Sequence, residues 1–130
     1  MTSLRYQSLY EAGLLALEDK KLRTVLELAG IKSIAIYGMG HLGKILYYLL
    51  TKNSIKVAYA LDKNTSIVIH GLEIIDPQID ELPDADMIII TAENDNKIIM
   101  QNLKAKSHAK MVLAKDFLDE LLISNMTNLV

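Results

Sequence analysis

The chain has 130 residues, which suits one compact domain, and hydrophobic residues make up 51% of it, enough to build a core. Lys and Arg number 14 against 16 Asp and Glu, and no basic run occurs, so the composition argues against nucleic acid as a partner. Cysteine is absent, which excludes disulfides and thiolate metal sites, and neither a signal-peptide pattern nor a bilayer-length apolar run occurs, so we expect a cytoplasmic protein without a membrane span.

The first predicted element is a helix over 9–29, in which apolar residues recur at helical spacing. Ser8 and Glu11 fit a capping box at its start, and Gly30 is a typical stop signal after its end. Because this helix precedes the first strand, residues 1–30 are predicted to be an N-terminal extension of the core fold. Its apolar face must cover either the chain's own sheet, which we favour, or another copy.

Short apolar runs then alternate with segments of helical spacing. Strands are predicted at 34–37, 57–61, 72–75, 87–90 and 111–113, with a further extended piece at 67–69. Helices are predicted at 41–52, at 94–106 with Ile98, Ile99 and Leu103 on one side, and at 116–122. This alternation predicts an α/β fold: a Rossmann-like, doubly wound parallel sheet of about five strands in the order 3-2-1-4-5. The predicted nucleotide-binding domain spans 31–123, and 124–130, which shows no clear pattern, is expected to be a tail.

The motif that indicates a function is the turn Gly38-Met39-Gly40-His41-Leu42-Gly43, which matches G-x-G-x-x-G between a predicted strand and a predicted helix. Gly38 allows a sharp turn, Gly40 lets a pyrophosphate approach the backbone, and Gly43 lets the helix pack closely on the strand. The unpaired N–H groups at the start of a helix, and its dipole, favour an anion there. The turn is therefore predicted to bind the phosphates of a dinucleotide.

Asp62 completes this pattern at the end of the second predicted strand. It stands 19 positions after Gly43, from the difference of the two residue numbers, and the fingerprint expects an acid roughly 20 residues on. Its carboxylate would accept hydrogen bonds from ribose hydroxyls and repel a 2′-phosphate, so NAD is predicted ahead of NADP. Lys63 is a neighbouring cation that would offset part of this repulsion.

Two further positions are candidates for ligand contact. Thr91 and Glu93 follow the fourth predicted strand, where ligands bind in this topology, although Asn94 or Asp95 can equally be there only to cap the next helix. His41 lies at the helix start beside the expected phosphate, where the alternative is a solvent-facing side chain with no role.

No catalytic residue and no metal site are predicted. Tyr48 and Lys52 have the Tyr-x-x-x-Lys spacing of short-chain dehydrogenases, but they lie on the first crossover helix instead of the later helix that carries that pair. No Ser-His-Asp grouping is visible, and no His, Asp or Glu cluster has metal-ligand spacing.

Four stretches of the chain resemble a set of small bacterial Rossmann-type domains that accompany surface-polysaccharide biosynthesis proteins. They are IYGMGHLGK at 36–44, VAYALDKN at 57–64, LPDADMIIIT at 82–91 and DFL at 116–118. These domains are similar to the N-terminal cofactor-binding part of nucleotide-sugar dehydratases and epimerases. The resemblance implies a pyrophosphate at 38–43 and an adenosine ribose at Asp62, and it carries over no catalytic residue.

The sequence therefore predicts an accessory or cofactor-binding domain for NAD(H) or a related nucleotide. Two alternatives stay open. In the first, a homodimer would complete the site of a nucleotide-sugar-modifying oxidoreductase; in the second, the domain would be a ligand-free Rossmann-like module that binds another protein. The expected macromolecular partner is a second copy or a larger biosynthetic protein.

Overall fold

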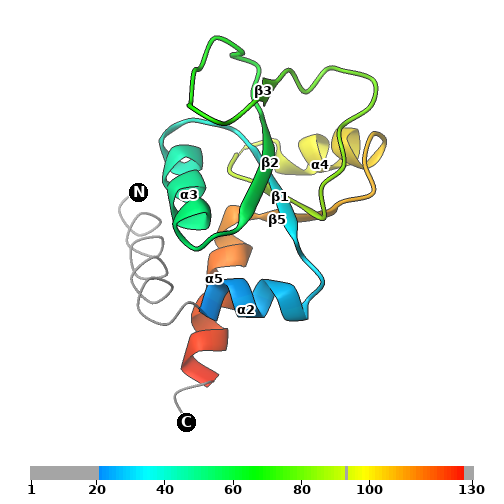
Figure 1. The fold of residues 1–130 in the computed structure, drawn as a ribbon. Helices are drawn as coiled ribbons and strands as arrows, with labels where there is room; N and C mark the ends of the chain where they lie inside the picture. Colours follow the sequence, from blue (N-terminus) through cyan, green and yellow to red (C-terminus); the bar gives the residue numbers. More distant parts are fainter. Residues whose placement is uncertain (1–20, 93, 128–130) are drawn as a thin grey trace.

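The computed structural model describes residues 21–92 and 94–127. It confirms the predicted α/β class: five strands form one all-parallel sheet in the order β3-β2-β1-β4-β5 (Figure 1). The elements in chain order are α2 (Lys21–Leu28), β1 (Ser33–Tyr37), α3 (His41–Lys52), β2 (Lys56–Leu61), β3 (Ile74–Ile75), β4 (Met87–Ile90), α4 (Asn96–Lys104), β5 (Lys110–Leu113) and α5 (Ala114–Thr127).

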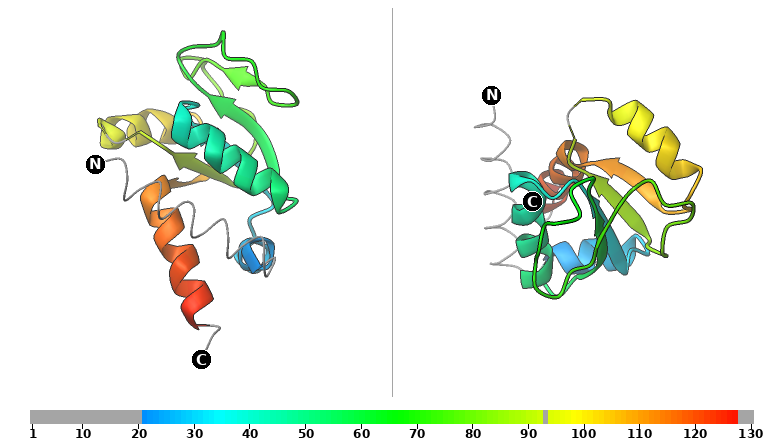
Figure 2. Two further views of the ribbon diagram at one scale, coloured as in Figure 1. Left: turned by 90° about the vertical axis from the view of Figure 1, so that its left-hand side faces the viewer. Right: turned by 90° about the horizontal axis from the view of Figure 1, so that it is seen from above.

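Helices lie on both faces of the sheet, α3 and α5 on one and α4 on the other (Figure 2). Successive residues of a strand point to opposite faces, so Ile34 and Ile36 of β1 join the core under α3 and α5. Ala35, between them, joins the core under α4. Burial on both faces explains why the strands read as continuous apolar runs.

Of the helix predicted at 9–29, the described residues show α2, Lys21–Leu28. Leu22 and Leu26 are buried in the same core cluster as β1 and α5, so this part of the helix covers its own domain. The helix ends at Leu28, and Gly30, the predicted stop signal after it, has a φ of 79°. The N–H of Ile31 donates to the carbonyl of Leu26 at 2.8 Å, which is the wrapping bond of a Schellman motif. The predicted capping box at Ser8 and Glu11 lies outside the described residues.

Helix α3 has the bounds predicted from the sequence, and its end repeats the Schellman pattern without a glycine. Ser54 has a φ of 60°, and the N–H of Ile55 donates to the carbonyl of Leu50 at 3.0 Å. The Schellman bond thus fixes the carboxyl-terminal end of the helix that follows the glycine turn.

The third strand is shorter than predicted. Gly71, with a φ of 78°, turns the chain so that Ile69 and Leu72 form an isolated antiparallel bridge, and only Ile74–Ile75 then pairs with β2. The extended piece expected at 67–69 is therefore part of a loop. No helix joins β3 to β4: the chain crosses between them as an irregular segment with Pro77 and Leu82 buried.

Two helix predictions need correction. Helix α4 begins at Asn96, because Asp95 adopts a left-handed conformation with a φ of 58°, and Ile98 is 57% exposed instead of lying beside buried Leu103. Helix α5 begins directly after β5 and continues to Thr127, beyond the predicted end and into the expected tail. Within the described ranges, no helix is long and apolar enough to cross a membrane.

Candidate functional site

The glycine turn joins the carboxyl end of β1 to α3, at the edge of the sheet where β2 and β4 also end. Gly38 has a φ of 93°, a conformation that L side chains rarely adopt. Gly43 is buried, and a Cβ there would overlap the carbonyl oxygen of Gly38 and lie 3.0 Å from its carbonyl carbon. These two glycines therefore serve the roles predicted for them, a sharp turn and close packing of the helix on the strand.

Gly40 differs from the other two glycines because it faces open space. It is exposed, has an ordinary φ of −73°, and a Cβ built on it would meet no atom within 4 Å. The fold therefore does not itself require glycine at this position. A side chain at Gly40, the N-cap residue of α3, would therefore extend into open space.

The start of α3 presents main-chain donors toward that space. The intrahelical hydrogen bonds begin with the N–H of Lys44, which donates to the carbonyl of Gly40 at 3.1 Å. Among hydrogen bonds within the described part of the chain, none uses the N–H of Gly40, Leu42 or Gly43. A helix leaves such groups at its N-terminus for side chains, water or ligands to satisfy, and the dipole adds positive potential there.

Asp62 lies beside the turn, half-buried at the end of β2. One carboxylate oxygen accepts from the N–H of Met39 at 2.8 Å, and the other accepts from the N–H of Asn64 at 2.8 Å. The N–H of Gly38 also donates to Leu61 at 2.7 Å, so the ends of β1 and β2 are held together. Each carboxylate oxygen keeps lone-pair capacity for a further donor.

Thr91 approaches the turn from β4, but its hydroxyl points into the protein. Its Oγ1 donates toward the carbonyls of Tyr37, at 2.9 Å, and Gly38, at 3.1 Å, while its main-chain N–H bonds to Tyr37 at 3.0 Å. A Cβ on Gly38 would overlap this hydroxyl. The observed contacts of Thr91 are therefore those of a residue that shapes the turn.

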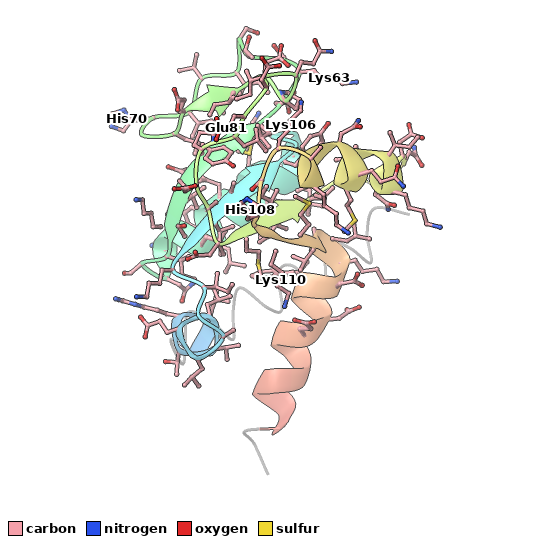
Figure 3. All side chains as sticks on the ribbon, turned by 90° about the vertical axis from the view of Figure 1, so that its right-hand side faces the viewer. Lys63, His70, Glu81, Lys106, His108 and Lys110 are labelled. Carbon is pink, nitrogen blue, oxygen red and sulfur yellow. The ribbon has the colours of Figure 1, made fainter. Side chains whose placement is uncertain are left out.

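The remaining predicted residues differ in what they present. Met39 is fully buried and its N–H is already bonded to Asp62, and Leu42 is buried as well. His41 is exposed at the first position of α3, and Lys63 is exposed just after Asp62 (Figure 3). Glu93 lies outside the described residues.

Sequence reasoning missed Tyr37 and Asn64, which border Asp62. Asn64 fixes the carboxylate through its N–H, and burial followed by the charge of Asp62 raises the pKa of Tyr37, so its phenol stays protonated at neutral pH. Tyr37 and Lys63 line a hollow of about 370 Å³ together with residues of the segment after β3 and of α4, such as Pro77 and Ile99. The hollow lies where no helix connects β3 to β4.

A larger hollow, of about 740 Å³, lies at the opposite edge of the sheet and touches none of the turn residues. Glu81, Lys106 and His108 are among its lining residues (Figure 3). One of its acids, Asp86, is already engaged by the N–H groups of Lys32 and Ser33 at 2.7 and 3.1 Å. We therefore place the candidate site at the glycine turn, where the unused donors are.

In the described ranges, no group of three or more His, Asp or Glu side chains is arranged to hold a metal ion. Tyr48, the rejected catalytic candidate, is 59% exposed toward the end of α3 that is remote from the turn, with the Nζ of Lys52 5.6 Å from its ring centroid. No protein-family model, curated protein or solved structure matches this chain significantly.

Proposed function

We propose that this chain binds NAD(H) or a related dinucleotide at the turn 38–43. The pyrophosphate would accept hydrogen bonds from the main-chain N–H groups of Gly40, Leu42 and Gly43, and the adenosine ribose would lie at Asp62. The observation that carries the proposal is the combination of unused donors at the start of α3 with open space at Gly40. Backbone donors at a helix N-terminus suit phosphate oxygens in both geometry and potential.

Asp62 supports the choice of NAD over NADP. Its carboxylate is fixed by Met39 and Asn64 and keeps acceptor capacity for ribose hydroxyls. A 2′-phosphate in the same place would meet the negative charge of a carboxylate that two N–H donors hold in position. Lys63 is exposed beside it and would offset part of that repulsion, so we expect discrimination between the coenzymes without complete exclusion of NADP.

We further propose a binding role in preference to a catalytic one. The hydroxyl of Thr91 is committed to main-chain carbonyls, and the raised pKa of Tyr37 disfavours it as a base. An accessory or cofactor-binding function in surface-polysaccharide biosynthesis follows from the sequence resemblance alone.

Titration calorimetry with NAD⁺, NADH, NADP⁺ and a nucleotide sugar tests the proposal, with Gly40→Val as the decisive variant. Valine at Gly40 fills the space in front of the helix start without meeting the fold, so binding should be lost while the thermal midpoint stays close to that of the wild type. A ligand at a hundredfold excess over its dissociation constant should stabilise the wild type by about 2.7 kcal/mol and leave the variant unchanged.

Thr51→Val is the matched control, because Thr51 is an exposed residue on the same helix, remote from the turn, and the substitution introduces the same side chain. It should bind as the wild type does. Asp62→Asn should narrow the preference for NAD⁺ over NADP⁺. Binding that survives Gly40→Val would show that the site lies elsewhere, and a wild-type chain that binds none of the four ligands would refute the proposed function.

A further inference from the structure

We propose that strand β5 is a homodimer interface, at which it pairs antiparallel with β5 of a second copy of this chain. β5 is the edge strand of the sheet in the described part of the chain, with β4 on one side only. An edge strand presents a row of unpaired main-chain groups that can pair with another strand. This inference does not depend on nucleotide binding.

The register of β5 decides which of its main-chain groups point outward. The N–H of Lys110 donates to the carbonyl of Asp86 at 3.0 Å, which places Lys110 among the residues that bond to β4. In a parallel ladder these residues alternate, so Val112 also bonds to β4. The N–H and carbonyl groups of Met111 and Leu113 therefore point to the open edge.

A hollow of about 550 Å³ lies along this edge between α4 and α5. Its apolar lining is formed by Met100 of α4 and by Met111, Val112 and Leu113 of β5. Its charged lining is mostly acidic and lies on the first turns of α5, where Asp116, Asp119 and Glu120 face it, with Lys97 of α4 on the other side. An apolar floor with a charged rim is the usual anatomy of a contact surface.

A two-fold rotation would bring the positive end of this edge in one copy against the negative end of the same edge in the other copy. Lys110 is exposed at the beginning of β5 (Figure 3), whereas the acids follow its end, so one chain holds them at opposite ends of the strand. Lys110 shares a sheet face with Val112, which packs in the core cluster of α5. Within 21–92 and 94–127, no ion pair involves Lys110, Asp116 or Asp119.

An antiparallel pair related by a two-fold axis perpendicular to the sheet keeps each face on the same side. With Val112 on the axis, Met111 of one copy lies opposite Leu113 of the other, and their outward groups match as a hydrogen-bonded pair. Lys110 of one copy then lies near the start of α5 of the other, on the sheet face that α5 covers. A C2 interface needs this kind of self-complementary patch, so we commit to a second copy as the occupant.

Sedimentation equilibrium of the full chain tests the pairing through a charge swap. The wild type should be a dimer. Lys110→Glu alone and Asp116→Lys/Asp119→Lys alone should each weaken dimerisation by about tenfold or more, because symmetry-related attractions become repulsions. The triple variant that combines them should regain it. Lys56→Glu/Glu73→Lys, which alters exposed charges beside β2 and β3 at the other edge, is the control and should stay dimeric.

Amide hydrogen exchange reads the main-chain contact directly. The N–H groups of Met111 and Leu113 should be protected from exchange in the wild-type dimer and should exchange fast in Lys110→Glu. The N–H of Val112, which bonds to β4, should stay protected in both proteins, as should the N–H of Lys110 in the wild type. A monomeric wild type, a dimer indifferent to these substitutions, or a triple variant that does not recover would overturn the proposal. Unprotected Met111 and Leu113 in a dimer would overturn it as well.

Discussion

Replacing Gly43 with alanine would insert a methyl group between helix α3 and the end of β1. The added Cβ would overlap the carbonyl oxygen of Gly38 and lie 3.0 Å from its carbonyl carbon and 3.2 Å from Sδ of Met39. Overpacking of a core costs about 1–3 kcal/mol, and the atoms met first here are main chain, which cannot swing aside. Alanine in place of glycine returns about 1 kcal/mol of helix propensity. Because the overlap with main-chain atoms puts the overpacking cost at the upper end, about 3 kcal/mol, and helix propensity returns about 1 kcal/mol, we expect the free energy of unfolding to fall by about 2 kcal/mol.

Urea denaturation monitored by circular dichroism measures this loss, and Gly40→Ala is its control. Gly40 has an ordinary φ and no neighbour within 4 Å of a built Cβ. Alanine fits the N-cap position less well than glycine, but it also makes the unfolded chain less flexible, and these two effects roughly offset each other. The stability of the Gly40→Ala variant should therefore stay within about 1 kcal/mol of the wild type. Equal stability of the Gly43→Ala and Gly40→Ala variants would refute the close-packing role of Gly43.

Two further predictions concern the residues around the turn. Thr91→Val removes the hydroxyl that bonds Tyr37 and Gly38, and should lower the free energy of unfolding by about 1–2 kcal/mol in urea denaturation; an unchanged midpoint would contradict the anchoring role. Burial and the charge of Asp62 raise the pKa of Tyr37 above 10.0, so the stability it contributes is full below about pH 10 and lost as pH rises through the folded-state pKa. The Tyr37→Phe variant should therefore lose less stability than the wild type between neutral pH and about pH 11. Parallel profiles of the free energy of unfolding against pH would exclude Tyr37 as the cause of the loss.

The sequence predicted those parts of the fold that depend on local pattern. The buried strands β1, β2 and β4 appear as apolar runs, and α3 starts and ends at the residues expected from the glycine turn and from Lys52. The sheet order followed from the alternation of strands and helices. These features are specified by period and by turn residues, which a single sequence displays directly.

The sequence could not predict features that depend on which residues come into contact in the folded chain. Thr91 was placed correctly at the edge of the sheet, but the direction of its hydroxyl is set by the carbonyls of Tyr37 and Gly38, which lie more than 50 residues earlier. Ser54 adopts a left-handed conformation, which a sequence normally indicates by a glycine that is absent here. Ile98 fits the apolar spacing of α4 yet faces solvent, because Ile99, Met100 and Leu103 form the side of the helix that packs inward.

Because Thr91 bonds to Tyr37 and Gly38, the geometry of the glycine turn depends in part on a residue outside the motif. Its bonds to Tyr37 and Gly38 cross 54 and 53 residues of sequence and join the two halves of the sheet. A fragment that stops before β4 would keep all three glycines, α3 and Asp62, but would lack the clamp that orients the Gly38 carbonyl against the helix. The glycine motif of this protein is thus local in sequence, but part of its geometry depends on a strand that comes more than 50 residues later.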